Sequence, residues 1–412
     1  MRTLYQDFNI CMPMKFGIIR EGKVPPDRRV VFSPQELLNF KTQFPQAGFK
    51  VEPSEIRVFK DEEYAGLGFE INDDLSDCDV LLGVKEVPID KLIPNKTYFF
   101  FSHTIKKQPY NKKLLQACLQ KNIRLIDHET LVDENGNRLI GFGRYAGIVG
   151  AYNTFRTFGE QFDLFHIQKA ENLHTQQDLI DRLKKLNLPP IKVLLTGKGK
   201  VGHGAREMLD GMKMKEVSEE DFLSKTYSHP VYTHVDYDKY YRRSDGNPVV
   251  KQEFREHPEW FESDFEKYSQ VADIFIAGHF YKEDSPYILT REMLKSSKNK
   301  IKVVGDISCD IDGPVACTIR PSTIAEPFYG YNPKTHQEVA LSHPEAIGVM
   351  AVDNLPCELP KDASEGFGKV FLERIIPAFF NDDADGVLQR ATICQNGQLT
   401  ERFNYLKDYA AD

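Results

Sequence analysis

The sequence predicts an α/β protein with two domains, each built on a parallel β-sheet, and a cleft between the domains. Short apolar runs rich in β-branched residues alternate with helical patterns in both halves of the chain, for example at 79–84 and 272–277. A third such run, 191–196, leads without a spacer into closely spaced glycines and then into a helical segment. The chain has 412 residues, which is enough for two domains of ordinary size.

The glycine-rich segment 191–206, IKVLLTGKGKVGHGAR, is typical of a strand–turn–helix that binds a dinucleotide. Gly197, Gly199 and Gly202 have the spacing G-x-G-x-x-G. The first glycine permits a tight turn, the second lets the backbone approach a pyrophosphate, and the third lets the helix pack closely on the strand. An ordinary flexible turn could show the same spacing, but the apolar run before it and the helical pattern after it favour a Rossmann-like domain over 190–354.

The other boundaries follow from composition. We expect a first, substrate-binding domain over 14–150, also Rossmann-like, completed by C-terminal helices in 355–412. The tract 227–268 is hydrophilic but holds too many aromatic residues for a disordered tether, so we interpret it as an insertion in the second domain. Residues 1–13 precede the first predicted strand and are expected to be disordered.

Individual elements follow from local patterns. Ser33 before Pro34 predicts the start of a helix, with serine as the N-cap and proline at the first helical position. Asn135-Gly136 predicts a hairpin turn. Predicted strands are 15–20, 49–51, 56–58, 79–84, 97–101, 124–126, 138–142, 191–196, 215–217, 272–277, 302–304 and 347–352. Further predicted helices are 111–121, 145–158, 176–186, 205–212 and 363–380.

Composition excludes several classes of function. A formal net charge of −8 argues against a nucleic-acid partner. The seven cysteines are odd in number and scattered, which favours reduced thiols and a cytoplasmic location. No Cys-x-x-Cys or His-Glu-x-x-His spacing occurs, so we expect no metal site, and the apolar runs are too short to span a membrane. No signal peptide is expected, and the oligomeric state is left open.

Candidate catalytic residues share one position, the carboxyl end of a predicted strand in the first domain: Lys85, Glu86, His103, Lys106 and Glu129. A lysine and a histidine beside carboxylates can have pKa values near neutrality, which suits chemistry at an amine or a carbonyl. Any one of these side chains could instead be a solvated loop residue. His103 is the sharpest candidate, whereas His128 and His279 fit structural or cofactor-adjacent roles better.

Two arginines of the first domain could bind carboxylates. Arg29 and Arg138 each offer a planar guanidinium that can hold a carboxylate through two hydrogen bonds. Together they would suit a dicarboxylic substrate. Either could equally form an ion pair within the protein.

The cofactor choice between NAD and NADP stays open. Asp306 and Asp353 follow apolar runs of the second domain and could face the cofactor or cap a helix. A ribose-binding acid is expected about 20 residues after the first glycine. There the chain reads Glu-Val-Ser-Glu-Glu over 216–220. An acid in that position would favour NAD, whereas Ser218 would leave room for the 2′-phosphate of NADP.

Several long motifs resemble a known family: GVKEVP (83–88), FFSHTIKKQ (100–108), RLIDHETLVDENGNRLIGFGRYAG (124–147), GDISCDIDG (305–313), STIAEPF (322–328) and VDNLPCELPKDASEGFG (352–368). They are similar to the lysine–2-oxoglutarate reductase domain of bifunctional aminoadipic semialdehyde synthase. They are more distantly similar to lysine-forming saccharopine dehydrogenase and to alanine dehydrogenase. The resemblance covers about 15–410 and implies a free-standing reductase, since nothing in the chain resembles the second enzyme of the bifunctional protein.

The resemblance implies an oxidoreductase that condenses the ε-amine of lysine with the ketone of 2-oxoglutarate and reduces the imine with a nicotinamide cofactor to give saccharopine. By matching motifs, Lys85 and His103 would be the general acid/base pair, and Arg29 would bind a substrate carboxylate. The resemblance also implies further residues lining the substrate or cofactor cleft: Glu86, Lys106, Glu129, Arg138 and Asp353. The alternatives are another amino-acid dehydrogenase of the same architecture, such as alanine dehydrogenase, and a non-catalytic nucleotide-binding regulatory protein.

Overall fold

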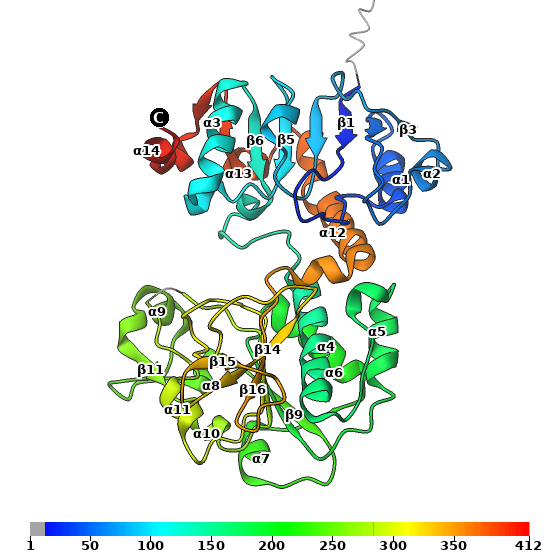
Figure 1. The fold of residues 1–412 in the computed structure, drawn as a ribbon. Coiled ribbons are helices and arrows are strands. Elements are labelled where there is room, and N and C mark those ends of the chain that lie inside the picture. Colours follow the sequence, from blue (N-terminus) through cyan, green and yellow to red (C-terminus); the bar gives the residue numbers. More distant parts are fainter. Residues whose placement is uncertain (1–12, 283, 412) are drawn as a thin grey trace, which may run out of the picture. The chain divides into compact units, whose positions relative to one another are not determined.

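The computed structural model describes residues 13–282 and 284–411, which form two compact units (Figure 1). The first unit comprises the chain up to Gly141 and from Ala363 onward, and the second comprises Phe142–Asp362. The prediction of disorder for residues 1–13 lies outside the described residues except for Pro13. The breaks fall at 141/142 and 362/363 rather than at 150 and 355.

The first break has a clear packing reason. Helix α4 (Gly143–Phe162) lies against α6 (Lys200–Gly211), the helix that follows the glycine turn. A Cβ added at Gly147 would lie 2.0 Å from the carbonyl oxygen of Val201, so the two backbones are in direct contact. Residues 142–150 therefore pack as part of the second unit.

The first unit contains an eight-stranded sheet in the order β18-β17-β6-β5-β4-β1-β2-β3. Its six parallel strands are β1 (Lys15–Ile18), β2 (Gly48–Val51), β3 (Glu70–Ile71), β4 (Val80–Leu82), β5 (Thr97–Phe100) and β6 (Arg124–Asp127). β2 and β4 lie on opposite sides of β1, so the winding direction reverses at this strand. Open α/β sheets bind ligands beside the carboxyl ends of strands at such a reversal.

The C-terminal segment adds more than the predicted helices to this unit. β17 (Thr392–Gln395) pairs antiparallel with β6, and β18 (Gln398–Leu399) pairs with β17. Thr392–Cys394 are buried, and Ile393 and Cys394 join the cluster that includes Leu125 of β6. The segment therefore adds two strands, which the sequence analysis did not predict, to the helices expected in 355–412.

Helices cover this sheet: α1 (Pro34–Gln43), α2 (Asp61–Ala65), α3 (Lys112–Gln120), α12 (Pro360–Arg374), α13 (Val387–Ala391) and α14 (Lys407–Ala410). The predicted cap of α1 is confirmed, because the Ser33 side chain accepts a hydrogen bond from the Glu36 amide. α12 ends at Arg374 rather than at 380, since Pro377 lacks the amide that would continue the helix. Residues 56–58 form no strand, because the buried Arg57 bonds locally to backbone carbonyls and to Asp61.

The second unit contains a sheet in the order β15-β14-β16-β13-β12-β7-β9-β8. Its parallel strands are β7 (Lys192–Thr196), β8 (Lys215–Glu216), β9 (Val231–Val235), β12 (Ile274–Ala277), β13 (Val303–Asp306) and β16 (Ile347–Met350). Antiparallel β14 (Phe328–Asn332) and β15 (Gln337–Val339) extend one edge. Comparison with the sequence shows that β9 lies within the predicted insertion 227–268. Its five residues are all buried and pair with β7, so the inserted part begins after Val235.

The remaining helices of this unit are α5 (Gln176–Leu183), α7 (Glu219–Ser224), α8 (Tyr237–Tyr240), α9 (Lys251–Glu256), α10 (Glu266–Ser269) and α11 (Arg291–Lys295). α4, α5 and α6 lie side by side (Figure 1). Between α8 and α10 the insertion forms α9 and a two-stranded ribbon, β10 (Tyr241–Arg243) and β11 (Phe261–Ser263). Its buried Tyr241, Phe254 and Phe261 join the core cluster that includes Phe275 of β12. Among the described residues, no helix has the length and apolar character needed to cross a membrane.

Candidate active site

The predicted catalytic residues gather at the carboxyl edge of the first sheet. β4, β5 and β6 are neighbouring parallel strands in register, so the segments that follow them emerge at the same edge. These segments carry Lys85 and Glu86, His103 and Lys106, and Glu129. The structure arranges them in two clusters, one around Glu86 and one around Glu129.

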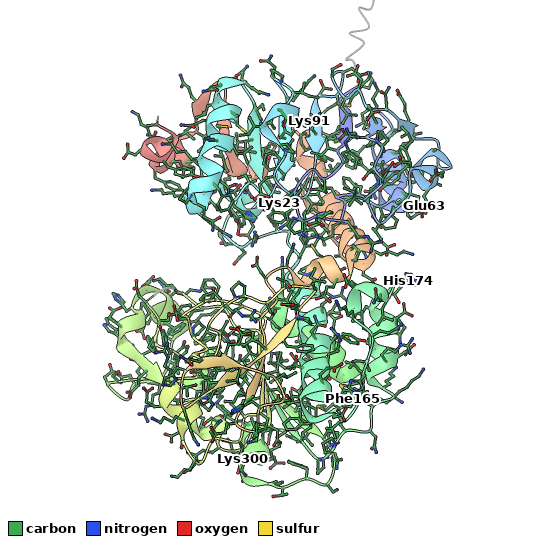
Figure 2. All side chains as sticks on the ribbon, in the orientation of Figure 1. Lys23, Glu63, Lys91, Phe165, His174 and Lys300 are labelled. Atoms are coloured by element: carbon green, nitrogen blue, oxygen red, sulfur yellow. The ribbon has the colours of Figure 1, made fainter. Side chains whose placement is uncertain are left out.

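Glu86 forms the first cluster with a lysine and a histidine. Its Oε2 lies 2.9 Å from the Nζ of Lys23, and its Oε1 lies 3.6 Å from the Nδ1 of His103 (Lys23 is labelled in Figure 2). Glu86 Oε1 and His103 Nδ1 are both buried, and neither has a hydrogen-bond partner among the described residues. The pair is therefore positioned to bind a polar group.

His103 is biased toward its neutral form. Burial lowers its pKa from 6.5, and the charges of Lys106 and Lys85 lower it further, whereas Glu86 and Glu129 raise it. A neutral imidazole near pH 7 can accept a proton, which a general base requires. The backbone of His103 is in the left-handed conformation, with a φ of 54°, directly before the 3-10 turn Thr104–Lys106. This conformation sets the direction of the imidazole ring.

Lys85 is positioned by a buried carboxylate that sequence reasoning missed. Glu21 accepts hydrogen bonds from the amides of Val84 and Lys85, both at 2.7 Å. Burial raises the pKa of Glu21 to about 8, against the lowering effect of these two bonds. The charge of Lys85 contributes to lowering the pKa of both Asp27 and His103. Glu21 follows β1 as Glu86 follows β4, so its strand-end position could have identified it.

Arg29 is already engaged by a carboxylate of the protein. It is 3% exposed, and its Nε and Nη2 lie 3.0 and 2.6 Å from the two carboxylate oxygens of Asp27. Burial opposes ionisation of Asp27, but the charge and hydrogen bonds of Arg29 outweigh it and lower the pKa to about 2. The Nε–Nη2 edge of Arg29 therefore holds Asp27, as in the alternative that the arginine forms an ion pair within the protein.

The second cluster brings two cations to one carboxylate. Glu129 Oε1 lies 3.2 Å from Lys106 Nζ and 3.3 Å from Arg138 Nη2. The Arg138 guanidinium also lies 5.7 Å from the centre of the Phe101 ring. Side chains of Lys106 and Arg138 are 49% and 42% exposed, so both can still meet an anionic ligand. Asp127, which is buried, fixes the segment by accepting the Glu129 amide at 2.6 Å.

His128 belongs to the core of the first unit. Its Nε2 lies 2.8 Å from the carbonyl oxygen of Gly83, and its ring packs edge-on against Phe367 and Phe371. Burial lowers its pKa to about 3, so the ring is neutral and donates to that carbonyl. Its role is structural.

The glycine turn of the second unit has the backbone geometry of a dinucleotide site. Gly197 has a φ of +87°, and a Cβ there would lie 2.5 Å from the Cα of His279. A Cβ at Gly202 would lie 1.7 Å from the carbonyl oxygen of Gly197. A Cβ at Gly199 would meet no atom within 4 Å, so this glycine faces open space that a pyrophosphate can approach. The amides at the start of α6 adjoin this turn, as anion binding requires.

A cavity of about 360 Å³ adjoins the turn. Its lining includes Asp236 at the end of β9 and His279 after β12. The Asp236 side chain makes no capping hydrogen bond to α8. His279 Nδ1 lies 2.9 Å from Thr196 Oγ1, whereas its buried Nε2 has no partner among the described residues. Burial lowers the pKa of His279 to about 3, so a neutral polar atom is available to a ligand. These features fit a nicotinamide dinucleotide.

Three other predicted cofactor residues are placed elsewhere. Ser218 follows the edge strand β8 and caps α7, accepting the amide of Asp221. Asp306 is buried and accepts hydrogen bonds from Ser308, Cys309 and Thr318. Asp353 is exposed. None of the three lines the 360 Å³ cavity.

Asp236, an acid outside the predicted site residues, directly follows the strand beside β7. The spacing rule assumes that the second strand of the domain lies beside the first. Here the edge strand β8 comes first in the chain, and the strand beside β7 is β9. The acid therefore follows Gly197 by 39 residues instead of about 20. The available signal was the segment Val231–Val235, rich in β-branched residues, which ends directly before Asp236.

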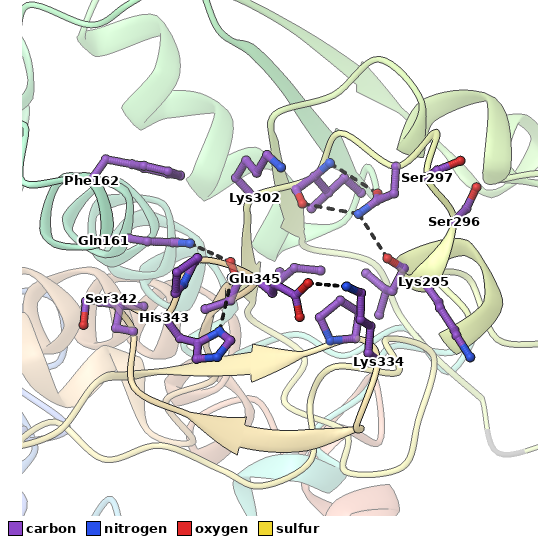
Figure 3. A pocket seen from close by; sticks show the side chains of 18 residues that line it. Gln161, Phe162, Lys295, Ser296, Ser297, Lys302, Lys334, Ser342, His343 and Glu345 are labelled. Carbon is purple, nitrogen blue, oxygen red and sulfur yellow. Dashed lines mark hydrogen bonds and ion pairs between the residues drawn. The ribbon is translucent and has the colours of Figure 1, made fainter.

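A second cavity of about 510 Å³ lies at the amino ends of β13 and β16, the edge opposite the glycine turn (Figure 3). Its lining includes Lys295, Lys302, Lys334 and His343. Lys334 forms an ion pair with Glu345. This cavity is separate from the dinucleotide site. Among the described residues, no group of three or more His, Cys, Asp or Glu side chains could hold a metal ion.

The chain is similar to several known proteins. Residues 17–149 match the family described as alanine dehydrogenase/PNT, N-terminal domain. The mitochondrial alpha-aminoadipic semialdehyde synthase of Mus musculus is 28% identical over 439 residues, which cover 92% of this chain and 46% of that protein. The saccharopine dehydrogenase (NAD(+), L-lysine-forming) of Yarrowia lipolytica is 25% identical over 386 residues, which cover 88% of this chain and 92% of that protein. The chain is homologous to aminoadipic semialdehyde synthases and lysine-forming saccharopine dehydrogenases.

The chain spans less than half the length of the synthases it matches; the synthase of Arabidopsis thaliana is covered over 37% of its length. Among solved structures, an L-alanine dehydrogenase has a TM-score of 0.64 at 16% identity and covers 97% of this chain and 100% of its own. A transhydrogenase from Sinorhizobium meliloti has a TM-score of 0.59 at 14% identity and covers 94% and 100%. These two likenesses concern the fold, and they confirm the predicted α/β class with two mostly parallel sheets.

Proposed function

We propose that the chain is a nicotinamide-dependent oxidoreductase that condenses L-lysine with 2-oxoglutarate and reduces the product to saccharopine, or catalyses the reverse reaction. The observation that carries the proposal is the cluster of Lys85, Glu86 and His103 at one sheet edge, in a chain homologous to proteins named for this reaction. A dinucleotide-type glycine turn in the other unit supports it.

The proposed proton chemistry belongs to His103 and Lys85. In the forward direction the substrate amine must lose a proton before it attacks the ketone, and the oxygen of the adduct must gain protons before it leaves as water. His103, held neutral, accepts the first proton, and the Lys85 ammonium donates toward the departing oxygen. The Glu86 carboxylate, 3.6 Å from Nδ1, would stabilise the imidazolium once the proton has been accepted. When bound, the nicotinamide supplies the hydride that completes the reduction.

We assign the substrate carboxylates to the second cluster. Lys106 and Arg138 are the exposed cations of the site, and their shared partner Glu129 keeps them close together. In this proposal Arg29 does not bind substrate directly. It is a buried arginine that forms an ion pair with Asp27, whose pKa the charge of Lys85 also lowers. Asp353 stays a proposed contact of the substrate or cofactor on the strength of its motif.

We propose NAD as the cofactor. The Asp236 carboxylate follows the strand beside β7 and can accept hydrogen bonds from both ribose hydroxyls. The same charge would repel the 2′-phosphate of NADP. We also propose a cytoplasmic location, supported by the free thiols of the six described cysteines, although the mouse relative is named as mitochondrial.

The test follows NADH and NADPH absorbance with lysine and 2-oxoglutarate, with each substrate omitted in turn and with pyruvate plus ammonia in parallel. Oxidation of NADH that needs both lysine and 2-oxoglutarate supports the proposal. Turnover with pyruvate and ammonia alone would instead indicate an alanine dehydrogenase activity. Cofactor binding without any turnover would indicate the regulatory alternative.

Variants test the residue roles. Lys85→Met and His103→Gln should each lower kcat at least a hundredfold, because each removes a proton-transfer group. Lys91→Met removes an exposed lysine of the same unit and should leave kcat unchanged. Normal turnover by correctly folded Lys85→Met and His103→Gln proteins would exclude this acid/base assignment.

A further inference from the structure

The insertion after β9 forms one wall of the dinucleotide cavity. Lys251, Phe254 and Arg255 of α9 line this cavity together with Tyr237 and Tyr240 of α8. The lining also includes the glycine turn, from Gly197 to Val201. The strand–turn–helix motif does not account for this second wall, which the inserted segment supplies.

Packing holds the wall in place. Phe254 is buried and stacks on Tyr237, with ring centres 5.8 Å apart and planes at 19°. The Phe254 ring also contacts Tyr241 at 4.7 Å and Phe261 at 5.2 Å. Helix α9 is thus anchored in the core of the second unit through one aromatic side chain.

A hydrogen bond fastens the end of α9 as well. Lys282, which follows β12 and also lines the cavity, donates from Nζ to the carbonyl oxygen of Arg255 at 2.6 Å. This bond joins the insertion to the segment after a central strand of the sheet. The wall is therefore a fixed part of the cavity.

The wall presents two exposed cations to the cavity. Lys251 Nζ lies 5.9 Å from the centre of the Tyr237 ring. Arg255 lines the same cavity one helical turn after Lys251. Positive charge here stands out, because the whole chain has a net charge of −8. A diphosphate at the glycine turn would lie between backbone amides and these two side chains.

We propose that α9 is a cofactor-binding element: Lys251 and Arg255 bind the diphosphate of the dinucleotide, and the stacked Tyr237–Phe254 pair flanks its adenosine half. This inference rests on the proposed function, since it takes the ligand to be a nicotinamide dinucleotide. The cations add charge-assisted bonds to those of the glycine turn. The insertion is thereby assigned a role in affinity for the adenosine diphosphate portion.

Binding can be measured without turnover. Trp260 is the only tryptophan of the chain and lies in the insertion, so its fluorescence reports titrations with NADH and with ADP-ribose. The Lys251→Gln/Arg255→Gln double variant should raise the Kd for both ligands about tenfold or more, as expected for lost charge-assisted contacts. Arg242→Gln is the matched control, because it removes a cation of the insertion that pairs with Glu262 outside the cavity.

The outcomes separate the two proposals. An unchanged Kd in the double variant, while the unmodified protein binds NADH, would overturn the inference and leave the proposed function standing. Tight ADP-ribose binding that depends on both cations, in a protein that never turns over lysine and 2-oxoglutarate, would support the inference and refute the function. We also expect the protein to bind the reduced form of nicotinamide mononucleotide, which lacks the adenosine half, more weakly than NADH. Equal affinity for the two would contradict the inference.

Discussion

Replacement of Glu21 by glutamine should change how stability depends on pH. The carboxyl group is 9% exposed, and burial raises its pKa from 4.5 to about 8. A carboxyl whose pKa is higher in the folded state contributes its stability fully below pH 4.5 and loses it as the pH rises to about 8. One pKa unit corresponds to about 1.4 kcal/mol, so the wild-type protein should lose roughly 3 kcal/mol of unfolding free energy through this group between pH 5.5 and 8.

The unfolding free energy of the glutamine variant does not fall with pH through this group, but it is lowered by a constant amount. The glutamine amide oxygen can accept only one of the two amides of Val84 and Lys85, and a buried amide without an acceptor costs about 1–3 kcal/mol. The stability of Glu21→Gln relative to wild type should therefore rise by roughly 3 kcal/mol between pH 5.5 and pH 8, whatever the size of the constant cost.

Urea unfolding followed by far-UV circular dichroism at both pH values measures this difference. Glu63→Gln, an exposed glutamate of the same unit that also accepts a backbone amide, is the control and should parallel wild type (Figure 2). Trp260 lies in the second unit, so we expect the substitution at Glu21 to leave the unfolding midpoint measured by its fluorescence unchanged. A constant difference between wild type and Glu21→Gln across this pH range would refute the reasoning.

Three further predictions concern the cofactor and substrate groups. Gly202→Ala should lower the melting temperature and weaken NADH binding, because its Cβ would lie 1.7 Å from a backbone oxygen. Gly199→Ala should weaken NADH binding without lowering the melting temperature, since a Cβ there meets no atom within 4 Å. An equal drop in melting temperature in both variants would contradict this prediction. Lys106→Met should raise the KM for 2-oxoglutarate about tenfold, and Lys107→Met, whose ammonium lies over the Tyr405 ring, should not. Asp236→Asn should raise the Kd for NADH about tenfold and that for NADPH less; equal changes in titrations of both cofactors would count against an NAD-selective acid.

The sequence predicted the elements whose cause is local. Apolar runs bounded by turns correctly predicted most of the parallel strands, since a strand buried on both faces leaves a continuous apolar run. The start of α1 followed from Ser33 and Pro34 alone. The close approach of α6 to its strand followed from the third glycine of the turn, and Gly202 indeed leaves no room for a Cβ.

Elements that depend on distant partners were less accessible. β17 pairs with β6 across about 270 residues of chain, and its short pattern resembles the end of a helical segment until that partner is known. The order of β8 and β9 likewise depends on the sheet, because nothing in either strand says which one lies beside β7. With that order, the position expected for a ribose-binding acid fell within 216–220 beside β8, whereas Asp236 follows the strand beside β7.

For the candidate site, the sequence predicted which polar residues lie at the ligand edge of the sheet, but not which of them form ion pairs with one another. A run of polar residues after a parallel strand predicts a place at the ligand edge, and this brought together Glu86 with His103 and Lys106 with Glu129. The pattern does not indicate how much charge remains for a ligand. Arg29 illustrates the limit, because a carboxylate only two residues away occupies its Nε–Nη2 edge.

The Asp27–Arg29 pair also bears on how Lys85 works. An isolated arginine beside this lysine would favour its neutral form, whereas a carboxylate beside it favours the ammonium. Asp27 is strongly ionised and senses the charge of Lys85, so the two effects oppose each other at the lysine. A general acid needs its proton at the start of the step. The ionised Asp27 and the Arg29 guanidinium carry opposite charges, so Asp27 offsets the repulsion that an unpaired arginine would exert on the ammonium proposed as the donor.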